Sequence, residues 1–216
     1  AFDEFAQGCL AERVHEALIK EHLGEALIGH LSRDGTAIEA RERPARSTGA
    51  APASRVAEQA TAPTPAIPAK KRGRPRRGEV RAPAKVSPLQ RQRQQGLAQM
   101  LADIPTRCDR GTKCNAQGYK ISWKGYKLHL DTACCGVPVS AVLSGANVHD
   151  SRVALPLSRI SAQRVVACYE LMDSAYCSSV IRQDIQAAGR VPLIDHNPRR
   201  GEKREFDPHE AQRYKT

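Results

Sequence analysis

The spacing of hydrophobic residues at the start of the chain predicts a helix followed by a strand. Leu10, Val14 and Leu18 recur at helical spacing and Gly24 supplies a stop, so we expect an amphipathic helix over residues 11–22. A largely apolar run over about residues 25–33 then predicts a strand that delivers Asp34 at its end.

The second half of the chain shows the patterns of further strands and helices. Residues 123–132 alternate, with Tyr126, Leu128 and Leu130 on one face, which predicts a half-buried strand. A turn leads from it into residues 137–143, giving a hairpin. The near-continuous apolar run at 165–172 suits a strand buried on both faces, central in a sheet flanked by helices, and it ends at Asp173.

Shorter elements complete the predicted α/β pattern. We expect a weak helix over residues 151–161, a helix that begins at Ser178 or Ser179 and ends at Gly189, and a short strand over residues 191–194. Asp207 and Pro208 carry the signals of a further helix start. The whole pattern indicates a mixed sheet with helices packed against it.

Between residues 43 and 95 the hydrophobic residues show neither helical nor strand periodicity. This interval holds eight of the 14 prolines and no aromatic residue, so it cannot bury enough surface to order itself. We therefore predict a disordered, basic insert over residues 43–95 within one domain, whose first part is residues 1–42 and whose remainder is residues 96–216.

The distribution of charge along the sequence indicates what the insert binds. The interval 43–95 carries 13 Lys or Arg against two acids, which accounts for the whole net charge of +11. A neutral domain with a basic insert points to a polyanion, most often nucleic acid. No run of 18 apolar residues is present, so we expect no membrane span and an intracellular location.

The sharpest motif of the insert resembles an AT-hook. A central glycine allows an extended backbone to lie in a narrow A·T-rich minor groove while flanking arginines insert along it. The alternative is a solvated basic linker. The predicted DNA-binding residues are Lys70, Lys71, Arg72, Gly73, Arg74, Pro75, Arg76 and Arg77.

Asp34 and Asp173 are the candidate catalytic and metal-binding residues. A carboxylate at the mouth of a buried strand is costly unless it is paired, hydrogen-bonded or bound to a cation, so two such residues suggest a metal site on neighbouring strands. Taken singly, each is also an ordinary turn residue. Asp109, in an Asp-Arg-Gly-Thr segment that resembles the Asp-Gly-Thr strand end at Asp34, is the alternative for the first acid.

Several motifs in a fixed order resemble the catalytic domain of DDE-type transposases from bacterial insertion sequences. The order is a strand ending in Asp-Gly-Thr, a Gly-Tyr-Lys-Leu-His strand, a return strand with proline, an Ala-Asn-x-His-Asp loop and a strand ending in Asp-x-x-Tyr. In this chain these motifs lie at Asp34–Thr36, Gly125–His129, Pro138, Ala146–Asp150 and Asp173–Tyr176.

The resemblance implies an RNase H-like fold in which Asp34 and Asp173 lie side by side and hold two Mg²⁺ or Mn²⁺ ions for DNA cleavage and strand transfer. It implies transposon ends and target DNA as partners, a homo-oligomer, and a cytoplasmic, nucleoid-associated protein. Basic residues near the acids, with Lys127, Arg199, Arg200 and Arg204 as candidates, would hold the DNA strand.

The third acid of such enzymes lies in a Tyr-x2-Arg-x3-Glu pattern on the last helix. Tyr214 can start that pattern, and its glutamate would fall beyond Thr216, so we expect a fragment that ends before this helix is complete. The alternative function is a catalytically inactive DNA-binding remnant that holds DNA through the AT-hook-like motif. A metal-dependent nuclease on the same fold is a third interpretation.

Overall fold

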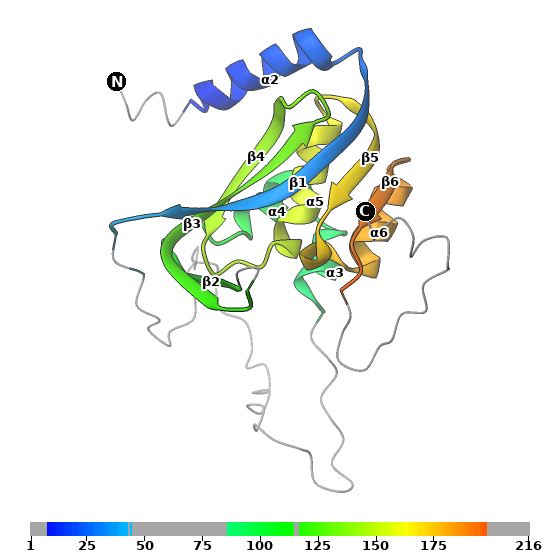
Figure 1. Cartoon of the computed structure of the whole chain (residues 1–216). Helices are drawn as coiled ribbons and strands as arrows, with labels where there is room; N and C mark the ends of the chain where they lie inside the picture. Colours follow the sequence, from blue (N-terminus) through cyan, green and yellow to red (C-terminus); the bar gives the residue numbers. More distant parts are fainter. Residues whose placement is uncertain (1–7, 43, 45–85, 115–116, 198–216) are drawn as a thin grey trace, which may run out of the picture. The chain divides into compact units, whose positions relative to one another are not determined.

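A computed structural model describes residues 8–42, 44, 86–114 and 117–197 (Figure 1). The chain divides into two units, residues 1–45 with 87–216 and residues 46–86, and the elements below all belong to the first. Most of the predicted insert, including the AT-hook-like motif, lies outside the described residues, as does the predicted helix start at Asp207.

One mixed sheet of six strands forms the centre of the first unit. Its order is β2-β3-β1-β5-β6, and β4 also pairs with β3. β1 runs antiparallel to β3 and parallel to β5, which is parallel to β6. The strands are β1 (Leu27–Glu39), β2 (Asp109–Cys114), β3 (Lys120–Ala133), β4 (Pro138–Gly145), β5 (Val166–Met172) and β6 (Val191–Ile194).

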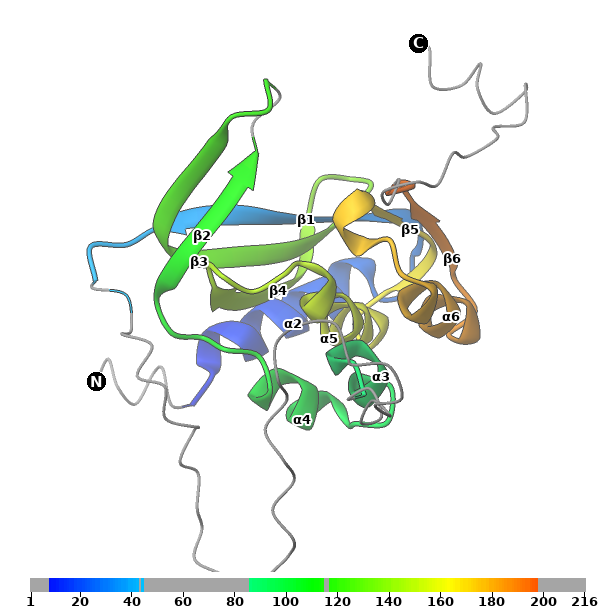
Figure 2. The ribbon, with the colours of Figure 1, turned by 90° about the horizontal axis from the view of Figure 1, so that it is seen from below.

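The described helices lie on one side of this sheet (Figure 2). α5 links β4 to β5, and α6 links the parallel pair β5 and β6, so α6 forms the crossover that such a pair requires. The helices are α2 (Leu10–Leu23), α3 (Pro88–Gln92), α4 (Leu97–Ala102), α5 (Ser151–Ala162), the 3₁₀ turn η1 (Ser174–Tyr176) and α6 (Ser179–Ala187). This mixed α/β architecture is consistent with the predicted RNase H-like fold of DDE enzymes.

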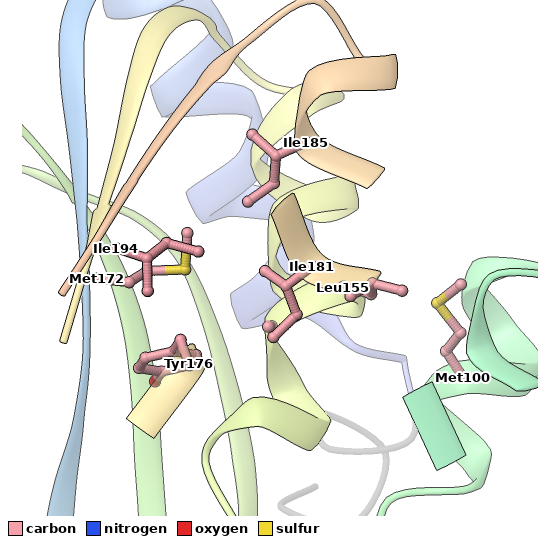
Figure 3. Close-up of a cluster of buried hydrophobic side chains, with 8 residues drawn as sticks. Met100, Leu155, Met172, Tyr176, Ile181, Ile185 and Ile194 are labelled. Atoms are coloured by element: carbon pink, nitrogen blue, oxygen red, sulfur yellow. The ribbon is translucent and has the colours of Figure 1, made fainter. Parts of the chain in front are cut away.

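A buried hydrophobic cluster fixes the end of the sheet that carries β5 and β6. Leu155 of α5 and Ile181 and Ile185 of α6 pack against Met172 and Ile194 of the two strands (Figure 3). Tyr176 of η1 belongs to the same cluster and is 1% exposed. The chain that leaves β5 is therefore anchored directly after Asp173.

The opposite face of the sheet is open among the described residues. Several large apolar side chains of β1, β5 and β6 remain at least 44% exposed on the sheet: Leu27, Val166, Tyr169, Val191 and Leu193. No helix among residues 8–42, 86–114 and 117–197 is long and apolar enough to cross a membrane.

The structure differs from the sequence expectations at five places. β5 is buried on one face only, since Val166 and Tyr169 are 60% and 44% exposed, whereas its apolar run predicted burial on both faces. β1 continues to Glu39, so Asp34 lies inside a strand instead of at its end. In β3 the polar residues His129 and Asp131 are the fully buried ones, while Leu128 and Leu130 are half-buried. β2 was not expected as a strand. α3, which begins with a capping box at Ser87, lies within the interval 43–95 predicted as disordered.

Candidate active site

Asp34 and Asp173 lie at neighbouring positions on adjacent parallel strands. Arg33 of β1 and Met172 of β5 are register partners, and each aspartate is the residue that follows one of them in the sequence. Parallel strands lie about 5 Å apart. Because side chains alternate along a strand and Arg33 is buried on the helix-covered face, the Asp34 carboxylate belongs to the open face of the sheet. Asp173 directly follows the last residue of β5, is exposed and caps η1.

Backbone amides orient one oxygen of each carboxylate. The amide of Gly35 donates to Asp34 Oδ1 at 2.7 Å, and the amide of Ala175 donates to Asp173 Oδ1 at 2.9 Å. The second contact caps η1. The structure therefore brings together the two acids that the sequence selected, Asp34 within β1 and Asp173 at the cap of η1.

The electrostatics of Asp173 indicate a place for a cation. Partial burial raises the pKa of Asp173, and the negative charges of Asp150, Asp34 and Asp195 raise it further, whereas the Ala175 hydrogen bond lowers it. Clustered carboxylates that disfavour one another's charge are relieved by a bound cation. Their oxygens are the ligand type that Mg²⁺ and Mn²⁺ take, so the pair fits such an ion. The described residues contain no group of three His, Cys, Asp or Glu placed to hold a metal.

Asp150 borders the acid pair and is held by Lys127. Lys127 Nζ donates to Asp150 Oδ1 at 2.8 Å and to the Val148 carbonyl at 3.0 Å. A Cβ on Gly35 would lie 3.6 Å from Asp150 Oδ1, which places this carboxylate beside β1. The charge of Lys127, a candidate for DNA contact, is thus already compensated.

Two histidines near the site have structural roles. His129 is fully buried, and its Nε2 lies 2.9 Å from Ser144 Oγ. Burial lowers the pKa of His129 to about 4, so its imidazole is neutral at pH 7. His149 is exposed and forms a local hydrogen bond with Ser151, as expected for a loop residue.

A cleft of about 870 Å³ opens beside Asp173. Its walls come from the middle of β1, the carboxyl ends of β5 and β6 and from α6, and include Asp195, His196 and Arg182. This position is the carboxyl end of parallel strands, where open α/β sheets bind ligands.

Asp109 lies in a different part of the sheet. It pairs with Gly125, which also pairs with Glu39, so five residues of β1 separate it from Asp34. This spacing corresponds to about 17 Å along the strand. Its carboxylate accepts a hydrogen bond from Asn147 at 2.6 Å. The structure does not bring Asp109 to Asp173.

The sequence analysis missed a buried ion cluster beneath the acids. Arg33, Asp131, Glu170 and Arg190 form it, and each is 9% exposed or less. Although burial alone lowers the pKa of Arg33, the carboxylates of Asp131 and Glu170 raise it above its ordinary value. The sequence did offer a signal for this cluster, because the apolar runs at 27–34 and 165–173 contain the oppositely charged residues Arg33 and Glu170.

Comparison with known protein families identifies a matching family model. The family model described as Transposase DDE domain matches residues 34–215 and so begins at Asp34. No curated protein and no solved structure matches the chain significantly.

Proposed function

Since this chain belongs to the transposase DDE domain family, we propose that Asp34 and Asp173 are two of its catalytic acids, acting in metal-dependent DNA cleavage and strand transfer. Their adjacent positions, Asp34 within β1 and Asp173 directly after β5, and the exposure of both residues carry this proposal. The family acts on DNA in transposition and generally uses divalent metal ions.

Each residue of the site has a defined task in this proposal. Asp34 and Asp173 would hold Mg²⁺ or Mn²⁺, and the amides of Gly35 and Ala175 keep one oxygen of each carboxylate oriented. The chemistry supplied by bound divalent ions is activation of water or a DNA 3′-hydroxyl and stabilisation of the leaving oxygen. The cleft lined by Asp173 would give a DNA strand access to this acid.

Two observations favour Asp34 over Asp109 as the first acid. Asp34 adjoins Asp173, whereas Asp109 lies on β2, separated from β5 by β3 and β1 and offset from Asp34 by five positions along the strand direction. The family match also begins at residue 34.

Binding of Mn²⁺ to the purified chain tests the acid pair directly. The electron paramagnetic resonance signal of free Mn²⁺ falls as the ion binds, which gives the affinity. We expect Asp34→Asn and Asp173→Asn each to weaken binding at least about tenfold, because each removes a charged ligand. Asp109→Asn is the matched control and leaves the affinity unchanged. If Asp34→Asn and Asp173→Asn bind Mn²⁺ as tightly as the control Asp109→Asn, the proposal is contradicted.

Catalysis requires a separate test with the gene in its natural context, so that any coding sequence downstream of Thr216 is retained. We expect Mg²⁺-dependent excision of the element from a plasmid that carries the gene with its flanking DNA, and strand-transfer products that a nuclease would not form. Asp34→Asn and Asp173→Asn abolish both, and Asp109→Asn does not.

A non-catalytic DNA-binding role is the second candidate. The observation that favours it is that the described residues contain no group of three His, Cys, Asp or Glu placed to hold a metal ion. On this proposal the chain binds DNA through residues 70–77 and, in the excision assay, yields neither cleavage nor strand transfer at any Mg²⁺ or Mn²⁺ concentration.

A further inference from the structure

The buried ion cluster joins three strands directly beneath the two acids. Arg33 contacts Asp131 of β3 through two hydrogen bonds, from Nε to Oδ1 and from Nη2 to Oδ2, each 2.7 Å long. Its Nη2 also forms an ion pair with Glu170 Oε2 of β5 at 3.0 Å. One planar guanidinium therefore spans β3, β1 and β5.

Further contacts hold the partners of Arg33. Asp131 Oδ2 accepts a hydrogen bond from Ser161 of α5 at 2.6 Å. Glu170 Oε1 pairs with Arg190 at 2.5 Å and accepts from Ser158 at 2.8 Å. The cluster contains two cations and two carboxylates, so it is neutral and its charges are compensated inside the protein.

Stability alone does not account for such a cluster. Buried ion pairs can often be replaced by apolar residues of similar volume without loss of stability, because desolvation offsets the attraction between the charges. What a forked arginine supplies is geometry, since its two parallel hydrogen bonds accept only one arrangement of the carboxylate.

That geometry controls the position of the acids. Arg33 directly precedes Asp34, and its register partners are Asp131 in β3 and Met172, the residue before Asp173, in β5. A slip of one residue between strands would turn every side chain to the other face. It would therefore place a carboxylate under the sheet and bring Arg33 onto the open face.

We propose that Arg33 is a positioning residue that locks β1 between β3 and β5, in the register that sets Asp34 beside Asp173. The role rests on the proposed function of the two acids, but the locking of strand register does not. A metal-free measurement therefore separates the two.

The test uses the full chain and two variants. In Arg33→Met/Asp131→Leu both partners become apolar, the net charge is unchanged and Glu170 keeps Arg190 and Ser158. Arg33→Lys keeps the charge and removes the fork. Ser140→Ala is the matched control, because Ser140 is buried in the same network through Ser161 and does not touch Arg33.

The first readout is strand register without metal. Nuclear Overhauser effects between residues 31–33 of β1 and 170–172 of β5 report it directly. We expect them to weaken or shift in Arg33→Met/Asp131→Leu while those between β3 and β4 persist, and to remain as in the parent chain in Ser140→Ala. Register contacts that are unchanged in the double variant overturn the proposal. If the double variant is unfolded, Arg33→Lys decides the question by the same contacts.

The second readout is Mn²⁺ affinity. Loss of a supporting interaction around metal ligands typically lowers affinity about tenfold to a hundredfold. We expect a loss in this range for Arg33→Met/Asp131→Leu, a smaller one for Arg33→Lys, and none for Ser140→Ala. An equal loss in Ser140→Ala contradicts a specific role of Arg33. A parent chain that binds no Mn²⁺ contradicts the proposed function, while the register contacts still decide the role of Arg33.

Discussion

Asp34 reaches the open face because it follows Arg33, which is 4% exposed on the helix-covered face, and strand alternation turns the next residue outward. Asp173 is exposed for a different reason, since it leaves the sheet directly after Met172 and caps η1. Both carboxylates are thus exposed to solvent while their backbones are held by packed structure. Rigid backbone and accessible oxygen atoms are both needed for a metal site of defined geometry.

The buried imidazole of His129 makes stability depend on pH. Its pKa, lowered by burial to about 4, lies below the value near 6.5 of the unfolded chain. Between these values the unfolded chain binds the proton first, so the free energy of unfolding falls as the pH drops from about 6.5 to about 4. The largest contribution is about 3 kcal/mol.

Urea unfolding at pH 7 and pH 4.5 measures this effect. We expect His129→Gln to lose less stability than the parent chain over this interval, whereas the exposed control His149→Gln loses as much as the parent. An identical loss in His129→Gln and the parent chain would show that His129 does not account for the slope.

At the scale of elements, α3 shows where regular structure resumes after the insert. Ser87 Oγ accepts from the amide of Gln90 at 3.2 Å, and Gln90 Oε1 accepts from the amide of Ser87 at 3.1 Å. This capping box and Pro88 start a helix whose Gln92 is buried and donates to the Arg152 carbonyl of α5. Regular structure therefore begins before Gln95, the predicted end of the insert.

Removing this cap should destabilise the domain measurably. We expect Ser87→Ala to lower the free energy of unfolding by about 1 kcal/mol, because the amide of Gln90 loses its partner. Ser178 precedes α6 without forming a side-chain cap, so Ser178→Ala is the matched control with a smaller effect. Equal effects of the two substitutions would mean that the Ser87 hydrogen bond contributes nothing.

At the scale of the whole molecule, the excess positive charge and the two proposed catalytic acids lie in different parts of the chain. The open face carries carboxylates, while the interval 43–95 accounts for the net charge of +11. We therefore expect affinity for DNA to come mainly from this interval, and chemistry from the sheet.

The salt dependence of DNA binding tests this division. Each phosphate contact contributes about 0.9 to the slope of log affinity against log salt concentration. We expect Arg72→Ala/Arg74→Ala to reduce the slope by about 2 and to weaken any preference for A·T-rich duplexes. Asp34→Asn/Asp173→Asn should leave the slope without such a reduction. A slope unaffected by the arginine substitutions would exclude the motif from DNA contact.

The sequence by itself determined the two strands that carry Asp34 and Asp173, the helix before the first and the family resemblance. These features depend on local spacing, because an apolar run or a helical period is visible within about ten residues. The order of short motifs then predicted the RNase H-like sheet.

Only the tertiary structure decided which face of β3 is buried and where Asp109 lies. The strand pattern suggested an apolar buried face, yet Asp131 is fully buried because Arg33, 98 residues away, supplies its partner. β2 became a strand through pairing with β3, and this pairing carried Asp109 away from Asp173. Pairing and charge compensation join residues distant in sequence, so their outcome depends on the folded sheet and not on local pattern.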